Sequence, residues 1–159
     1  MKWEDLADQP CSVARTIAII GDRWTMMIIR DCFNGSRRFD EFQVSLGISR
    51  TIVTDRLNLL VEEGVLTKVP YQEKPIRYEY RLTEKGLDLY PILLSMFSWG
   101  DRYYATKEGP PLLFRHKTCG HDFHSKVCCS ECDQELKPRE VEVRAGPGLK
   151  KRRARGAQA

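Results

Sequence analysis

The stretch LGISRTIVTDRLNLLVEEGVL, residues 46–66, constrains the fold more than any other part of the chain. Ser49 is a favourable N-cap for a helix over residues 50–63, and a glycine stands where that helix should end. The apolar positions of this helix recur at helical spacing, which predicts a buried stripe of Val53, Leu57, Leu60 and Val61. A shorter helix is expected over about residues 40–46, and Gly47 makes the tight turn between the two helices.

The residues that follow, VLTKVPYQEKPIRYEYRL, are typical of two β-strands joined by a polar loop. The expected strands cover about residues 66–71 and 77–82, with QEKP as the loop. Apolar and charged residues alternate in the second strand, which is the period of a half-exposed strand. A hairpin directly after two helices and a glycine turn is a wing. We therefore predict an α+β, mainly α, winged helix-turn-helix domain.

Three more helices are expected around this motif. Residues 11–21 have apolar side chains at helical spacing, and Asp22 can cap a second helix, RWTMMIIRDCF. The last helix begins at Thr83, and its apolar residues occupy too many faces for a surface helix of a monomer. Its extra face predicts a homodimer in which the same helix of a second subunit packs against it. Pro91 should split or kink this helix, because an interior proline costs about 3 kcal/mol.

The charge and hydropathy of the chain limit its class and compartment. The formal net charge is +4, but the basic excess lies entirely after Leu136, and the preceding residues are slightly acidic in balance. A DNA-binding hypothesis for the body must therefore depend on where its charges lie. The apolar runs are far shorter than the roughly 18–20 residues of a membrane span, and the N-terminus has no signal-peptide character. We expect a cytoplasmic protein with reduced thiols and no membrane partner.

A cluster of soft ligands lies in the segment HKTCGHDFHSKVCCSECDQEL: all three histidines and four of the six cysteines fall between His116 and Cys132. His116-x-x-Cys119 and Cys129-x-x-Cys132 each place two ligands on one turn, and together they complete a tetrahedral set for structural zinc. Nine residues separate the two pairs, fewer than in a usual zinc ribbon. A cysteine cluster without metal remains the alternative, and the substitute ligands are His121, His124 and Cys128.

Several motifs resemble the HxlR-type winged helix regulators of bacteria. They are GDRWTMMIIRDCFNGSRRFDEF, LGISRTIVTDRLNLLVEEGVL and YEYRLTEKGLDLYPIL, and the likeness runs from about Cys11 to Trp99. The resemblance implies a homodimeric DNA-binding repressor or activator. Longer members of this family also end in a CG…CxxC segment and a Gly-Pro-Gly, as here. The pair after Gly-Ile-Ser is Arg50-Thr51, whereas the family often has a basic or amide-bearing pair, so no relative supplies the operator sequence.

The candidate DNA contacts belong to the second helix of the motif, the residues before it and the wing. Arg50 is the best candidate for bidentate reading of a guanine, and Thr51 for contact with a thymine methyl group. Arg37 and Arg38 could bind phosphates, and the wing residues could reach the backbone or the minor groove. The full set is Arg37, Arg38, Ser49, Arg50, Thr51, Thr54, Arg56, Lys74 and Arg77. The alternative for each arginine alone is a solvated charged face.

Cys11 lies at the start of the first expected helix, where backbone N–H groups stabilise a thiolate. Some HxlR-type regulators use a cysteine at this position to sense electrophiles or oxidants, so the resemblance implies a sensor thiol here. A small residue packed against the dimer helix is the alternative, and a small-molecule effector is another source of regulation. Cys32, inside the second helix, is expected to lie in the core.

The sequence thus predicts a domain over residues 1–106, a zinc-ribbon-like module over 107–144 and a disordered basic tail over 145–159. We predict a DNA-binding transcriptional regulator that is not an enzyme, because no Ser/His/Asp set, phosphate loop or carboxylate pair is visible. The competing hypotheses are a winged helix used only for protein contacts, and a zinc-dependent or redox enzyme on this scaffold. A catalytic zinc would keep an open coordination position, whereas four ligands are available here.

Overall fold

The computed structural model describes residues 3–149, which fall into two compact units. The first unit runs to Asp88 and also includes the segment from Gly146, and the second comprises Leu89–Ala145. The first unit contains a 3₁₀ helix and seven further elements: Trp3–Leu6, α1 (Ser12–Ile20), α2 (Arg23–Phe33), α3 (Phe39–Leu46), α4 (Arg50–Glu62), β1 (Leu66–Glu73), β2 (Ile76–Leu82) and α5 (Glu84–Leu87). The second unit begins with α6 (Tyr90–Tyr104).

The helix starts follow from side-chain caps. Asp22 Oδ1 accepts hydrogen bonds from the backbone N–H groups of Trp24 and Thr25 at 3.0 and 3.2 Å, which fixes the first turn of α2. Ser49 Oγ accepts from the N–H of Ile52 at 3.3 Å and begins α4. Gly47 ends α3 with φ +61°, a left-handed conformation in which a side chain would be strained. The helix-turn-helix predicted from this stretch is therefore present, with α3 and α4 as its helices.

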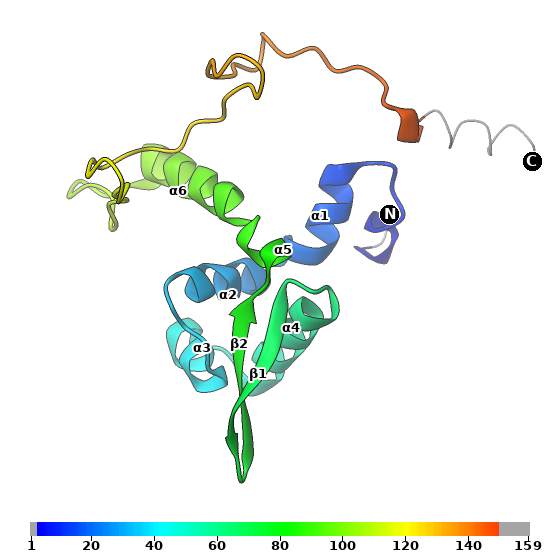
Figure 1. Ribbon diagram of the computed structural model, residues 1–159, viewed down its shortest axis with the longest axis vertical. Coiled ribbons are helices and arrows are strands. Elements are labelled where there is room, and N and C mark those ends of the chain that lie inside the picture. The colour runs from blue at the N-terminus through cyan, green and yellow to red at the C-terminus, as the bar shows by residue number, and fades with distance from the viewer. Residues whose placement is uncertain (1–2, 150–159) are drawn as a thin grey trace, which may run out of the picture. The chain divides into compact units, whose positions relative to one another are not determined.

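The core of the first unit lies between α2, α3, α4 and the start of β1 (Figure 1). Its apolar side chains come from all four elements and are almost completely buried: Ile28, Ile29, Phe42, Val53, Leu57, Leu60, Val65 and Leu66. Each contributes about 1.5–3 kcal/mol of transfer free energy. This packing fixes α4 against the remainder of the unit, so the exposed face of α4 has a defined orientation.

The wing is an antiparallel pair of strands, β1 and β2, whose register begins at Leu66 opposite Leu82. Both strands are longer than the sequence predicts, and the register shifts between Pro70 and Gln72. The wing base is joined to the loop before α3, because the N–H of Tyr80 donates to the carbonyl of Arg37 at 2.7 Å. Arg37 and the wing therefore have a fixed relation within this unit.

The helix expected to begin at Thr83 is split into two. The short α5 starts at Glu84, and α6 starts at Tyr90 with Pro91 in its first turn. A proline is tolerated there because the N–H groups of a first helical turn have no partner within the helix. Gly86 in α5 is buried, and a Cβ there would lie 2.3 Å from the Val65 carbonyl oxygen. The close approach of α5 to Val65, the residue before β1, thus requires glycine.

The remaining expectations concern the C-terminal part. Residues 107–144, expected to form a zinc-ribbon-like module, contain turns and isolated β-bridges. Within this stretch the structure has no β-strand longer than one such bridge. Of the expected tail, residues 145–149 are described, and Pro147–Leu149 are helical; the KKRRAR run lies outside the described residues. Within residues 3–149, no helix combines the length and the apolar character of a membrane span.

Candidate nucleic-acid interface

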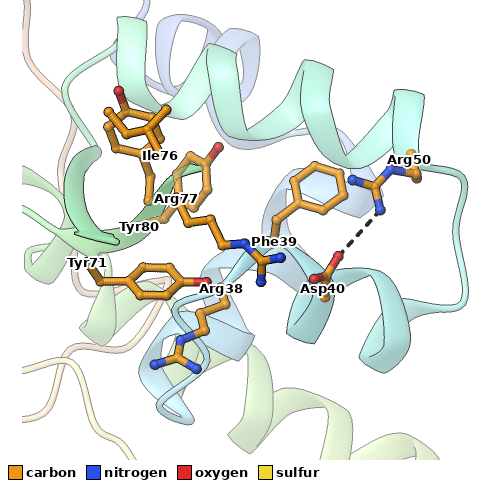
Figure 2. A pocket seen from close by; sticks show the side chains of 9 residues that line it. Arg38, Phe39, Asp40, Arg50, Tyr71, Ile76, Arg77 and Tyr80 are labelled. Atoms are coloured by element: carbon orange, nitrogen blue, oxygen red, sulfur yellow. Dashed lines mark hydrogen bonds and ion pairs between the residues drawn. The ribbon is translucent and has the colours of Figure 1, made fainter. Parts of the chain in front are cut away.

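A groove opens between α3, the start of α4 and the wing, with a volume of about 430 Å³. We call it the wing groove, and it is lined by Arg38, Phe39, Asp40, Arg50, Tyr71, Ile76, Arg77, Tyr78 and Tyr80. Figure 2 shows its three arginines gathered around aromatic rings. The groove therefore gathers positive charge on one face of the unit, as a polyanion requires.

Arg50 is the first residue of α4 and projects into this groove. Its Nη1 lies 3.4 Å from Asp40 Oδ1 and 3.4 Å from Gln43 Oε1, and its guanidinium lies 4.6 Å from the centre of the Phe39 ring. The dashed line in Figure 2 marks the Arg50–Asp40 pair. Both partners are highly exposed, with side-chain exposures of 69% and 75%, so water screens the attraction. Arg50 can therefore leave Asp40 and bind a ligand at a small cost in free energy.

Arg38 lines the other side of the groove. Its guanidinium lies 4.5 Å from the centre of the Tyr71 ring, and its Nε is 3.6 Å from Glu79 Oε1. Glu79 also accepts from Arg81 at 2.9 Å, and this bond is the main cause of its lowered pKa. The neighbouring backbone is fixed as well: the N–H groups of Arg37 and Arg38 donate to Glu41 Oε2 at 2.7 and 3.0 Å.

The wing supplies the outermost cations. Arg77 stands near the start of β2, opposite Gln72, and lines the wing groove. Lys74 lies in the turn between the two strands and is exposed. Both predicted wing residues are thus accessible at the end of the hairpin that extends from the helical core (Figure 1).

The candidates on α4 divide into two groups. Arg50, Thr51 and Thr54 are exposed, and the Thr54 hydroxyl donates to the carbonyl of Arg50 at 2.8 Å. Arg56 instead turns toward the start of α2, where its Nε lies 3.1 Å from Asp22 Oδ1 and its side chain is 34% exposed. Ser49 is occupied as the helix cap. The structure thus brings Arg38, Arg50 and Arg77 into one groove and places Arg56 outside it.

Sequence reasoning did not single out the acidic and aromatic members of the groove. Asp40 forms an ion pair with Arg50. The rings of Tyr71 and Phe39 lie against the guanidinium groups of Arg38 and Arg50, respectively. A signal was present in the alternation of tyrosines with charged residues along the wing. The pairing of these rings with arginines of α3 and α4 depends on tertiary contacts, which a local pattern does not contain.

The cysteines occupy distinct environments. Cys11 is the exposed N-cap residue of α1, where its side chain makes no capping hydrogen bond. Burial is the main cause that raises the pKa of Cys32 to about 12, so its thiol stays protonated and unreactive. In the second unit, His116 Nδ1 lies 3.3 Å from Cys119 Sγ, and backbone N–H groups of Glu131 and Cys132 lower the pKa of Cys129. Among residues 3–149, no group of three or more His, Cys, Asp or Glu side chains is close enough to hold a metal ion.

Known proteins share this architecture. The family model described as HxlR-like helix-turn-helix matches residues 19–108. The uncharacterized HTH-type transcriptional regulator Rv3095 of Mycobacterium tuberculosis (strain ATCC 25618 / H37Rv) is 43% identical over 139 residues, covering 87% of this chain and 88% of the relative.

Solved structures agree. The crystal structure of PA1607 is 35% identical with a TM-score of 0.78, covering 88% of this chain and 98% of that one. The redox regulator HypR in its reduced form is 32% identical with a TM-score of 0.54, covering 58% of this chain and 92% of that one.

The winged fold and these matches define a helix-turn-helix DNA-binding transcriptional regulator, not an enzyme. The chain belongs to the HxlR-like helix-turn-helix family, and it extends beyond the matched residues into the segment that contains four of its cysteines.

Proposed function

We propose that this regulator binds double-stranded DNA as a homodimer, with the first turn of α4 in the major groove and the wing side of the wing groove against the phosphate backbone. The observation that carries the proposal is the gathering of Arg38, Arg50 and Arg77 in one groove. Arginine binds phosphate and guanine through two parallel hydrogen bonds. The rings of Phe39 and Tyr71 support two of these guanidinium groups and leave their N–H edges available.

Arg50 is the proposed base-reading residue. It stands at the exposed start of α4, and giving up its exposed pair with Asp40 costs at most about 1 kcal/mol. A bidentate contact to guanine discriminates against other bases by about 1–3 kcal/mol, so the exchange favours the right DNA. Thr51 and Thr54 are exposed near the start of α4 and are proposed to contact thymine methyl groups.

The other candidates have supporting roles in this proposal. Arg37, Arg38, Lys74 and Arg77 bind phosphates and set the orientation of the unit on the duplex. Ser49 acts through the cap that fixes the start of α4. Arg56 stabilises the contact between α4 and the start of α2 through Asp22, which makes it a packing residue.

The dimer is proposed to form through α6. Ile92, Met96, Trp99 and Tyr103 are exposed by 41, 49, 59 and 59%. Their spacing of four, three and four residues is that of a coiled-coil seam, which we call the α6 seam. An apolar stripe of this kind favours the same stripe of a second copy. Two recognition helices would then read half-sites about one helical turn apart.

Regulation is proposed to act through Cys11. This thiol is exposed at the start of α1 and is therefore accessible to oxidants and electrophiles. Among the similar structures, HypR is a redox regulator with a reduced and an oxidized form. Modification of Cys11 would alter DNA binding by changing how α1 packs against α2 in the first unit. Cys32 serves as the internal comparison, because its partly buried thiol has a raised pKa and should react far more slowly.

The test is equilibrium binding of the purified, reduced chain to DNA from around its own gene, with a random duplex as competitor and salt varied. A strong preference for one site, with a steep loss of affinity at high salt, supports the proposal. Equal weak binding to both duplexes contradicts it and favours a winged helix that contacts proteins. Sedimentation of Met96→Glu beside the unchanged chain tests the dimer: the variant should sediment as a monomer.

A further inference from the structure

The C-terminal segment contains an internal repeat. Residues 114–123, FRHKTCGHDF, align with residues 127–136, VCCSECDQEL, without a gap. The alignment pairs His116 with Cys129 and Cys119 with Cys132. Apolar residues occupy both ends of each copy, and each copy has one acidic residue beside its last position. We call the two copies the first and second knuckles.

The backbone hydrogen bonds repeat more closely than the sequence, in which Cys119 and Cys132 are the one identical pair. In the first knuckle three backbone N–H groups donate to backbone carbonyls. The N–H of residue 116 donates to the carbonyl of 121 at 2.9 Å, that of 120 to the carbonyl of 116 at 2.8 Å, and that of 123 to the carbonyl of 114 at 2.9 Å. In the second knuckle the same bonds join 129 to 134, 133 to 129 and 136 to 127, each at 2.9 Å. Bridges between 115 and 122 and between 128 and 135 complete the correspondence. Two segments of different composition therefore form one and the same hairpin.

The turn residue of each knuckle has a left-handed backbone. Gly120 has φ +72°, and its counterpart Asp133 has φ +57°. Asp133 is the one non-glycine residue with positive φ within residues 3–149. Such a conformation is unfavourable for a residue with a side chain, so the second knuckle keeps the hairpin shape although its sequence lacks the glycine.

The two side chains of the first knuckle lie about as far apart as two ligands of one metal ion. His116 Nδ1 and Cys119 Sγ lie 3.3 Å apart. Two ligands of a tetrahedral zinc, with Zn–N and Zn–S bonds of ordinary length, lie about 3.6 Å apart. In the second knuckle the backbone N–H groups of Glu131 and Cys132 are directed at the Cys129 sulfur.

We infer that the two knuckles bind one Zn²⁺ ion per chain through His116, Cys119, Cys129 and Cys132, independently of DNA binding. The two ligand pairs do not converge in the structure, where no three such side chains within residues 3–149 come together. Residues 124–126 link the hairpins, and the N–H of Ser125 donates to Ser98 Oγ of α6 at 3.1 Å. The ion joins the pairs by bending this link, a coupling of binding and folding that is common for structural zinc.

The repeat also selects among the possible ligands. Cys128 aligns with Arg115, which forms an ion pair with Asp122 at 2.9 Å. The repeat therefore does not use this position for a metal ligand. His121 aligns with Gln134, and His124 lies in the link. These three residues therefore provide matched controls: they are of the same types as the ligands and lie in the same segment.

The test is titration of the full reduced chain with Co²⁺, followed by displacement with Zn²⁺. One equivalent of Co²⁺ per chain should give the ligand-field bands of tetrahedral thiolate coordination, and Zn²⁺ should abolish them. Cys119→Ser and Cys132→Ser, one from each knuckle, should each weaken Co²⁺ binding by about a hundredfold or more. Cys128→Ser and His124→Ala should leave it unchanged.

Three results would overturn the inference. They are loss of binding in only one of the two knuckle variants, binding of one ion per two chains, and no thiolate coordination in the reduced chain. Asp133→Gly guards against a folding artefact, because it changes the second knuckle without touching a ligand and should bind Co²⁺ as the unchanged chain does. The helical circular dichroism of each variant should match that of the unchanged chain, since the winged helix unit lies outside the knuckles.

Discussion

Replacing Arg50 with alanine should separate base reading from general DNA affinity. In the free protein this side chain has an exposed pair with Asp40, a long and exposed hydrogen bond to Gln43 Oε1 and a ring contact with Phe39, so removing it changes the stability by about 1 kcal/mol. On the preferred site, loss of a bidentate guanine contact costs about 1–3 kcal/mol. Affinity for that site should therefore fall by about 5- to 150-fold, while affinity for a random duplex changes little.

Asp40→Asn gives the opposite perturbation. It releases Arg50 and removes a carboxylate from the wing groove, so affinity for every duplex should rise by up to about fivefold. Fluorescence anisotropy with labelled duplexes at several salt concentrations measures both effects. Lys74→Ala is the comparison for a phosphate contact, and it should reduce the salt slope by about one. If Arg50→Ala weakens the preferred and random duplexes equally and lowers the salt slope, Arg50 binds phosphate and the base-reading assignment is wrong.

Three further predictions concern stability. Leu57→Ala removes a fully buried side chain and should lower the free energy of unfolding by about 2–5 kcal/mol in urea titrations. The control Val44→Ala, at an exposed position, should have almost no effect. Gly86→Ala places a Cβ 2.3 Å from a carbonyl oxygen and should destabilise by about 1–3 kcal/mol; Gly100→Ala meets no atom within 4 Å and should be neutral or stabilising. Hydrogen bonds from the backbone N–H groups of Arg37 and Arg38 lower the pKa of Glu41 below its ordinary value of 4.5. The contribution of Glu41 to the free energy of unfolding is therefore complete above pH 4.5 and is lost as the pH falls through the lowered pKa. In acid titrations followed by circular dichroism, Glu41→Gln should lose less stability than the unchanged chain.

The helices and the wing were predictable because their signals are local. Ser49 and Asp22 cap the helices that the sequence indicates, and the glycine at 47 adopts the left-handed conformation expected of it. Pro91 left two alternatives open, a kink or a split, and the structure shows the split. Strand ends were less well predicted, because pairing across the wing extends β1 to Glu73 beyond its apolar pattern.

The candidate site was predictable only in part. The exposed arginines could be named from their place in the motif, but the orientation of Arg56 toward Asp22 depends on packing between α2 and α4. The partners Asp40 and Tyr71 come from α3 and the wing, which meet only in the folded unit. The repeat of the knuckles was present in the sequence, but its two copies share few identical residues. Their common hydrogen bonds made the repeat visible.

Hydroxyl-radical footprinting of the full reduced chain on its preferred DNA tests the central proposal most directly, because it reports the position and symmetry of the contacts together. A dimer with two reading α4 helices predicts two equivalent protected regions, related by a two-fold axis and about one helical turn apart. The Met96→Glu variant should lose this paired pattern. A single asymmetric protected region with the unchanged chain, or uniform protection along the duplex, would contradict the proposal that two copies read the DNA through α4.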